Sequence, residues 1–243
     1  MSKELFRINS ALDPQRLHAE FRARGRLHVA SFLEEEDAER LLRYLQTAEI
    51  WKLVFNSGDK LFELDRQVQG ALTAEQREQL DQAVHAQARY GFQFCYETMR
   101  VPDAEAQRQV SGTLLDQFAS FLSSERALNF LRTVTGEPAI TFADAQATAY
   151  GPGHFLTAHD DGVAGKNRKA AFVVNLSPDW SADWGGLLAF HERGIGPAQA
   201  IVPTFNALNL FSVPQLHSVT MVAPFAPRRR YSVTGWLRTG VKP

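Results

Sequence analysis

The sequence predicts an α+β protein in which N-terminal helices support a C-terminal core built as a double-sheet jelly roll or barrel. Up to about residue 135, apolar residues recur mainly at helical spacing. After Gly136 and Pro138 they gather in short β-rich runs separated by Gly, Pro and Asn, with no helical pattern between them. The chain contains no repeat, low-complexity segment or flexible linker. We therefore expect residues 1–243 to form a single domain, with 1–135 as a mainly helical support region and 136–243 as the jelly-roll core.

Local signals mark the first helices of the support region. Asp13 can cap a helix that begins at Pro14, and Gly25 is suited to end it. The next segment, 27–29, is a short apolar run of strand type. A second helix is expected from about Glu34, because an acidic run suits its first turn and apolar residues then follow on one face.

The middle of the chain carries a hairpin signal and further helices. Residues 51–64 are predicted to form two strands around an Asn-Ser-Gly-Asp turn. Thr73 and Gln76 form a capping-box pattern for a long helix that continues to about residue 88. Two more helices are expected within 111–135. Three aromatic residues at 92, 94 and 96 alternate as in a strand edge or cover a groove, although core packing is the default interpretation of such a run.

In the second half, turn residues separate eight runs of strand type. The predicted strands are 140–150, 155–160, 170–176, 187–191, 199–202, 207–213, 216–223 and 229–237.

Composition narrows the functional classes. Lys and Arg total 26 against 27 Asp and Glu, so the formal net charge is -1 and no global field attracts nucleic acid or an anionic membrane. The basic run 166–169 and Arg228-Arg229 are most simply solvated turns. The single cysteine, Cys95, cannot form an internal disulfide, and the N-terminus is too polar for a secretory signal. With no apolar run of membrane-spanning length, we expect a cytoplasmic protein without nucleic-acid or membrane partners.

The stretch LTAHDDG, residues 156–162, holds the first candidate site residues. Side chains alternate along a strand, so His159 and Asp161 point the same way if strand geometry persists to residue 161. They would then present two metal ligands together. Taken alone, the same pattern also fits a surface histidine followed by a turn.

The last β-rich segment adds a second histidine and an arginine. His217 begins one predicted strand, and Arg230 begins the strand that returns beside it, with Ser232 on the same face. Two histidines and one carboxylate, with three positions left open, are the ligand set of non-heme Fe(II) oxygenases. An inward arginine beside a hydroxyl is suited to hold a carboxylate in a bidentate manner. The pattern therefore predicts a metal together with an anionic cosubstrate.

The segment from Tyr150 to Trp236 resembles the double-stranded β-helix core of Fe(II)- and 2-oxoglutarate-dependent dioxygenases, in the branch of prolyl 4-hydroxylases and hypoxia-factor prolyl hydroxylases. The matching pieces, in order, are AYGPGHFLTAHDD, AAFVVNLSPDWSADWGGLLAF, LNLFSVPQLHSV and RRRYSVTGWLR. This resemblance implies a hydroxylase that uses Fe(II), 2-oxoglutarate and O2, with ascorbate as a further expected cofactor. The substrate that it implies first is a prolyl residue in a peptide or protein.

The resemblance also assigns residues. It implies that His159, Asp161 and His217 bind iron and that Arg230 pairs with the distal carboxylate of 2-oxoglutarate, assisted by Ser232. Tyr150 stands where family members often add a phenol hydrogen bond to the cosubstrate. Relatives often carry a tyrosine near 174–175, where this chain has Val174 and Asn175. Asn175 is the substitute that we expect for that contact.

Other functions fit the same residues. The substrate can instead be a free amino acid or another small metabolite, since a fold does not fix a substrate. A metal-binding jelly roll of the cupin type, in which Arg230 is structural and 2-oxoglutarate is not used, is a second class. A non-catalytic binding module that keeps the fold without turnover is a third. The oligomeric state does not follow from the sequence.

Overall fold

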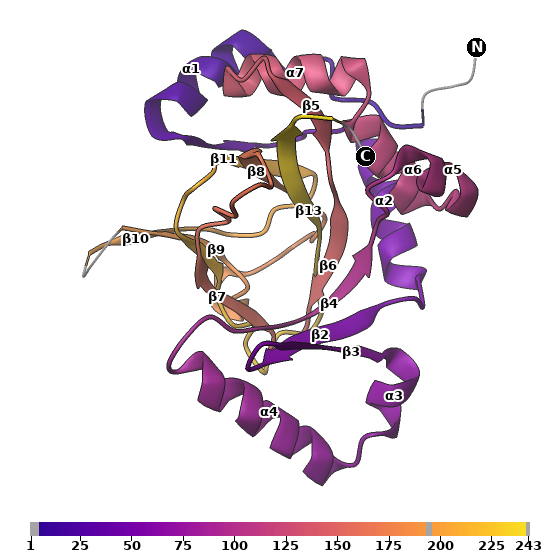
Figure 1. The fold of residues 1–243 in the computed structure, drawn as a ribbon, viewed down its shortest axis with the longest axis vertical. Helices are drawn as coiled ribbons and strands as arrows, with labels where there is room; N and C mark the ends of the chain where they lie inside the picture. Colours follow the sequence, from indigo (N-terminus) through magenta and orange to yellow (C-terminus); the bar gives the residue numbers. More distant parts are fainter. Residues whose placement is uncertain (1–4, 193–195, 242–243) are drawn as a thin grey trace.

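The computed structural model describes residues 5–192 and 196–241 and shows a curled antiparallel sheet with helices at both ends (Figure 1). In the view of Figure 1, α1 and α7 lie across the top of the sheet and α4 lies below it. The helices in chain order are α1 (Pro14–Arg24), α2 (Glu35–Thr47), α3 (Arg66–Ala71), α4 (Ala74–Ala88), α5 (Glu105–Ser111), α6 (Leu114–Leu122) and α7 (Glu125–Thr135), with a short 3-10 helix at Ala182–Trp184.

Capping explains where the predicted helices begin and end. The Asp13 carboxylate accepts hydrogen bonds from the backbone N–H groups of Gln15 and Arg16, and Gly25 ends α1 with a φ of 64°. Thr73 and Gln76 form the capping box that begins α4. Both signals were predicted. The helices α3 and α5 were not predicted, because α3 has only six residues and contains a glycine, and the residue before α5 makes no side-chain cap.

The strands extend across both halves of the chain. They are β1 (Arg26–Val29), β2 (Lys52–Ser57), β3 (Lys60–Asp65), β4 (Phe94–Arg100), β5 (Ile140–Ala143), β6 (Gln146–Tyr150), β7 (Phe155–His159), β8 (Arg168–Asn175), β9 (Leu188–His191), β10 (Ala198–Ile201), β11 (Ala207–Ser212), β12 (His217–Val219) and β13 (Arg230–Thr239). The hairpin predicted within 51–64 is present as β2 and β3. The single strand predicted for 140–150 is wrong: it is two strands, β5 and β6, joined by Asp144 and Ala145.

The helical half also contributes strands to the core. The strand β4 pairs with β6 and β7, and β2 pairs with β4, so residues before 135 form part of the same sheet as the jelly-roll strands. Residues 1–135 are thus mainly helical and also contribute the strands β1 to β4 to the sheet. In the strand order β4 lies between β6 and β7, so this strand connects β6, β13 and β8 on one side to β7, β12 and β9 on the other.

The strand β13 forms the middle of the larger wall and carries Arg230 at its first position. It pairs along one edge with β8 and along the other with β6, with Arg230 opposite Tyr150 and Ser232 opposite Thr148. At Gly235 the chain crosses so close to Asp144 that a Cβ atom would lie 1.9 Å from its carbonyl oxygen. Only glycine fits at this position.

The apolar core lies between the sheet and the N-terminal helices. The largest cluster of buried residues joins the apolar faces of α2, α6 and α7 to the outward-facing residues of β6, β8 and β13, including Leu41, Phe118 and Leu131 from the helices and Phe172 and Val233 from the sheet. On the opposite face of the sheet, none of the described residues that line the cavity belongs to a helix.

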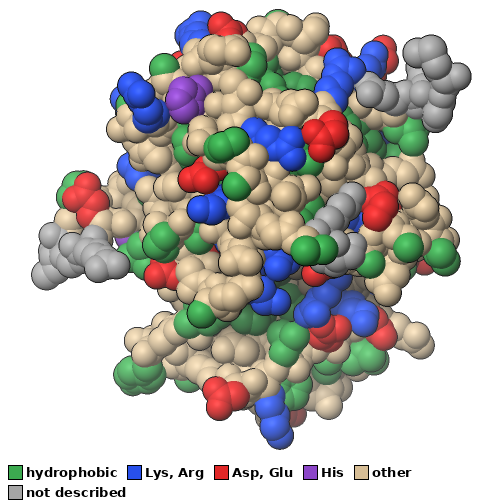
Figure 2. Space-filling view, turned by 45° about the horizontal axis from the view of Figure 1, so that its top comes forward, with side chains coloured by type: hydrophobic (Ala, Val, Ile, Leu, Met, Phe, Trp, Pro, Cys, Tyr) green, Lys and Arg blue, Asp and Glu red, His purple; other side chains and the backbone are tan. Residues whose placement is uncertain are grey.

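The surface bears mixed charges. Over the face seen in Figure 2, Lys and Arg side chains lie among Asp and Glu, without a large area of one sign. In the described part of the chain, no helix combines the length and the apolar character that crossing a bilayer requires.

Candidate active site

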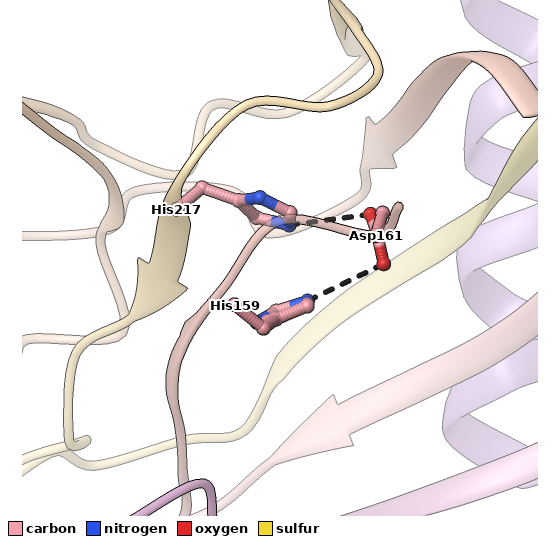
Figure 3. Close-up of side chains that lie close together, drawn as sticks. All are labelled: His159, Asp161 and His217. Atoms are coloured by element: carbon pink, nitrogen blue, oxygen red, sulfur yellow. Dashed lines mark ion pairs between the residues drawn. The ribbon is translucent and has the colours of Figure 1, made fainter. Parts of the chain in front are cut away.

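The two histidines and the carboxylate predicted as metal ligands meet inside the barrel (Figure 3). His159 ends β7 and His217 begins β12, and these residues lie directly opposite each other in the antiparallel pair. Asp161 Oδ1 is 3.5 Å from His159 Nε2, and Asp161 Oδ2 is 3.5 Å from His217 Nε2. All three candidate ligand atoms lie within 4.8 Å of one another.

Asp161 reaches this position by a route that the sequence did not predict. The strand β7 ends at His159, and Asp161 has a φ of 62°, in the left-handed region. The condition on which the prediction depended, strand geometry up to residue 161, is therefore not met, although the carboxylate does converge on the histidines. Aspartate is one of the few residues that adopts this conformation readily. Arg168 and the backbone N–H of Val163 both donate to the Asp161 carbonyl oxygen, at 3.1 and 2.9 Å.

Backbone carbonyl groups orient both imidazole rings. His159 Nδ1 donates to the carbonyl oxygen of Thr157 at 3.0 Å, and His217 Nδ1 donates to that of Gln215 at 2.8 Å. Because a carbonyl only accepts, each Nδ1 carries the proton and each Nε2 presents its lone pair toward Asp161. Burial and the nearby His159 ring lower the pKa of His217 to about 4, so this ring is neutral near pH 7.

This donor set fits a divalent iron ion. Two neutral imidazole nitrogens and one carboxylate on one side leave three coordination positions open, which is the arrangement of non-heme Fe(II) oxygenases. The backbone carbonyls behind the rings supply the second layer of hydrogen bonds that such ligands require.

The first position of β13 holds a buried cation, Arg230, which has no acidic partner among the described residues. Arg230 is 1% exposed, and among the described residues no carboxylate pairs with it. Its Nη2 donates to Asn175 Oδ1 at 3.4 Å, its guanidinium lies 5.2 Å from the centre of the Tyr150 ring, and its Nε has no hydrogen-bond partner. Burial lowers the pKa of Arg230. A buried, unpaired guanidinium is unfavourable unless an anion binds to it.

The remaining predicted cosubstrate residues surround Arg230. Ser232 Oγ lies 2.8 Å from Thr148 Oγ1 on the facing strand, and both line the cavity that holds the triad. Tyr150 also lines this cavity. Asn175 is fully buried beside Arg230 but is not part of the cavity lining, and its Nδ2 has no partner. The roles of Tyr150 and Asn175 in binding the cosubstrate stay predictions.

The cavity that contains these groups has a volume of about 400 Å³. This is enough for a small dicarboxylate together with one substrate side chain. Phe92, Phe94, Tyr96 and Tyr150 form one wall, with successive ring centroids 5.7, 5.6 and 5.1 Å apart. The aromatics at 92–96 therefore line a cavity, as the groove interpretation predicted, and core packing, the default interpretation, is wrong for Phe92, which is 49% exposed.

Arg168 and Trp236 are among the cavity residues that sequence reasoning missed. Arg168 was assigned to a solvated basic turn, but its side chain is only 15% exposed and lies 3.8 Å from Asp161 Oδ1. Its guanidinium stacks on the Trp236 ring at 3.5 Å. Both Arg168 Nε and Trp236 Nε1 are buried donors without a partner. Trp236 continues the period-two face of Arg230 and Ser232, so extending that pattern along the strand would have found it.

Comparison with known proteins agrees with this geometry. Residues 145–238 match the model of the 2OG-Fe(II) oxygenase superfamily. These residues belong to that superfamily. We call them the oxygenase core.

Curated relatives of the oxygenase core include the prolyl 3-hydroxylase OGFOD1 of Xenopus laevis, 32% identical over 130 residues, which are 51% of this chain and 23% of that protein. The mouse protein of the same name is 28% identical over 130 residues, 51% of this chain and 22% of that protein. The chain thus spans less than a quarter of the length of these relatives.

Solved structures support the fold of the oxygenase core and of the segments around it. A prolyl 4-hydroxylase from Pseudomonas putida superposes with a TM-score of 0.59 at 17% identity, over 94% of this chain and 100% of that one. A prolyl hydroxylase from Trichoplax adhaerens, solved with a peptide fragment of hypoxia inducible factor, gives a TM-score of 0.58 at 15% identity, over 93% of this chain and 90% of that one. These likenesses extend the shared fold to the N-terminal half.

Proposed function

We propose that this chain is a 2-oxoglutarate- and Fe(II)-dependent hydroxylase that oxidises a prolyl residue in a peptide or protein. One observation carries the proposal: a set of two histidines and a carboxylate shares a cavity with Arg230, a buried guanidinium that has no carboxylate partner among the described residues. The first supports a metal with open positions, and the second supports an anionic cosubstrate beside it.

His159, Asp161 and His217 would hold the iron, and Arg230 with Ser232 would hold the distal carboxylate of 2-oxoglutarate. Bound Fe(II) would supply the oxidative chemistry, in which O2 and 2-oxoglutarate are consumed, succinate and carbon dioxide are released, and one oxygen atom enters a substrate C–H bond. The protein would orient the substrate, and the aromatic wall would keep water from the reacting atoms.

A second pair of unpaired donors supports a substrate with a carbonyl group. Arg168 and Trp236 contact each other, and each keeps one buried N–H without a partner. Trp236 is six residues from Arg230 on the same strand, about 20 Å away at an ordinary strand rise. One ligand group therefore does not satisfy both sets of donors. A peptide carbonyl at Arg168 and Trp236 would place the adjoining residue beside Asp161.

A prolyl substrate rests on the relatives, which are named prolyl 3-hydroxylase and prolyl 4-hydroxylase. Because these names differ in the carbon that is oxidised, the proposal leaves C3 and C4 open. A free amino acid is the second candidate, and one observation favours it: the charged guanidinium of Arg168 would bind a free carboxylate at least as well as an amide carbonyl.

Succinate formation tests the proposal. Anaerobically purified protein would receive Fe(II), ascorbate, 2-oxoglutarate and then air, with proline-containing peptides in one series and free proline in another, and Asp161→Ala as the inactive control. Peptide-stimulated, Asp161-dependent succinate together with a peptide 16 Da heavier by mass spectrometry would support the peptide hydroxylase. Stimulation by free proline alone would favour the second candidate. Tight metal binding without measurable binding of 2-oxoglutarate would contradict both and favour the cupin-type alternative.

A further inference from the structure

A buried glutamine is bonded to the strand that carries the first metal ligand. Gln93 directly precedes β4 and is fully buried. Its backbone N–H donates to Thr157 Oγ1 at 2.8 Å, and the same hydroxyl donates back to the Gln93 carbonyl oxygen at 3.0 Å. The backbone N–H of Thr157 donates to that carbonyl as well, at 2.9 Å. We call this three-bond contact between Gln93 and Thr157 the clasp.

The clasp leads directly to His159. The Thr157 carbonyl is the group that accepts the hydrogen bond from His159 Nδ1, at 3.0 Å. The residue before Gln93, Phe92, packs its ring 5.5 Å from the His159 ring. Gln93 therefore acts on the His159 imidazole through Thr157, whose carbonyl accepts its hydrogen bond, and Phe92 packs directly against the His159 ring.

The Gln93 side chain fixes the position of the clasp. Its Oε1 accepts from the backbone N–H of Phe94 at 2.8 Å, and its Nε2 donates to the carbonyl oxygen of Asn56 in β2 at 3.0 Å. The same nitrogen lies 3.0 Å from the side-chain amide of Gln87 in α4. A buried polar network of this kind is rigid when every group has a partner. The network connects α4 and the β2–β3 hairpin to the ring of His159.

We propose that Gln93 and Thr157 are positioning residues of the metal centre, which hold His159 in the rotamer and tautomer that bind the metal. This inference rests on the proposed function. Losing a hydrogen-bond partner behind a metal ligand costs roughly 10- to 100-fold in metal affinity. Thr157→Val removes the hydroxyl of the clasp but keeps the carbonyl that His159 contacts. We therefore expect the lower end of that range, about 10-fold.

The chain offers a matched control. Ser123 Oγ also donates to and accepts from one backbone position, Ala143, at 3.0 and 3.1 Å, and it is buried where the end of α6 meets β5. Ser123→Ala therefore breaks the same kind of two-way contact in another part of the molecule. Thr157→Ser restores the hydroxyl of the clasp. The affinity of each full-length variant for Mn(II) would be measured by calorimetric titration without 2-oxoglutarate, together with its melting temperature.

The expected result is an Mn(II) affinity about 10-fold weaker for Thr157→Val, with wild-type affinity in Thr157→Ser and in Ser123→Ala. Unchanged affinity in Thr157→Val, or equal weakening in Ser123→Ala, would overturn the clasp. If Thr157→Val does not fold, Gln93→Leu tests the same idea by removing the bonds to Asn56 and Phe94, and wild-type affinity in that variant also overturns it. A wild-type protein that binds no Mn(II) would refute the metal centre itself, and with it the proposed function.

Discussion

Replacing Arg230 with alanine should weaken 2-oxoglutarate binding by about 2 to 5 kcal/mol, the usual cost of removing one partner of a buried charge pair. At about 1.4 kcal/mol for each factor of ten, this is roughly a 30-fold to several-thousand-fold loss of affinity. We expect the upper part of that range because Arg230 is 1% exposed and its neighbours Asn175, Ser232 and Tyr150 carry no charge. In the alanine variant the distal carboxylate would be buried among neutral donors only.

Calorimetry with Mn(II)-loaded protein would measure this effect without turnover. The control ligand is 2-oxobutyrate, which has the keto acid end of 2-oxoglutarate but no distal carboxylate, so its affinity should be the same in wild type and Arg230→Ala. Mn(II) affinity should also be unchanged, since Arg230 is not a metal ligand. The reasoning is refuted if 2-oxoglutarate binds the variant as it binds wild type, or if both keto acids lose affinity equally.

Three further changes test other parts of the site. Asp161→Ala and Asp161→Asn should both lose tight Mn(II) binding. The free energy of unfolding should be about 1 kcal/mol lower for the alanine variant than for the asparagine variant, because alanine fits the left-handed backbone at this position less well. Equal urea midpoints for the two variants would contradict this. Trp236→Phe keeps an aromatic ring but removes the indole N–H donor, so KM for the peptide should rise about threefold to tenfold at unchanged kcat. An unchanged KM would exclude Trp236 from substrate contact. Burial lowers the pKa of His217 to about 4, below its usual value of about 6.5. Between these pH values the unfolded chain binds more protons than the folded chain, so the free energy of unfolding of metal-free protein should fall as pH is lowered through this window. An equal fall in the His217→Gln variant would show that other groups cause the pH dependence.

Much of the fold could be predicted because local signals and tertiary packing agree. The caps at Asp13 and Thr73 and the hairpin within 51–64 each depend on neighbours in sequence, and each is present. The break between β5 and β6 could not be predicted from the chain between 140 and 150, because it depends on β13 passing close to Asp144 at Gly235. The place of β4 in the sheet likewise depends on partners far along the chain.

The site shows the same division. His159, Asp161, His217, Arg230 and Ser232 were found because short motifs and strand alternation place them, and the structure brings all of them to one cavity. The residues that pack against them could not be predicted from the sequence. Arg168 resembles any solvated arginine in a basic run, and only the pairing of β8 with β13 brings it onto Trp236 and next to the Asp161 carboxylate.

The unpaired donors decide between a metal centre that merely stabilises a jelly roll and one that works on two ligands. A structural metal needs its protein ligands and their hydrogen-bond acceptors, which the histidines and Asp161 already have. It does not need Arg230 and Arg168 buried with unpaired N–H groups, and each such group costs about 1 to 3 kcal/mol while it lacks a partner. Because both arginines share one cavity with the triad but lie toward opposite ends of β13, one acceptor group does not reach both of them, and two separate acceptor groups would satisfy them. An enzyme that binds a cosubstrate carboxylate and a substrate carbonyl at the same time supplies both.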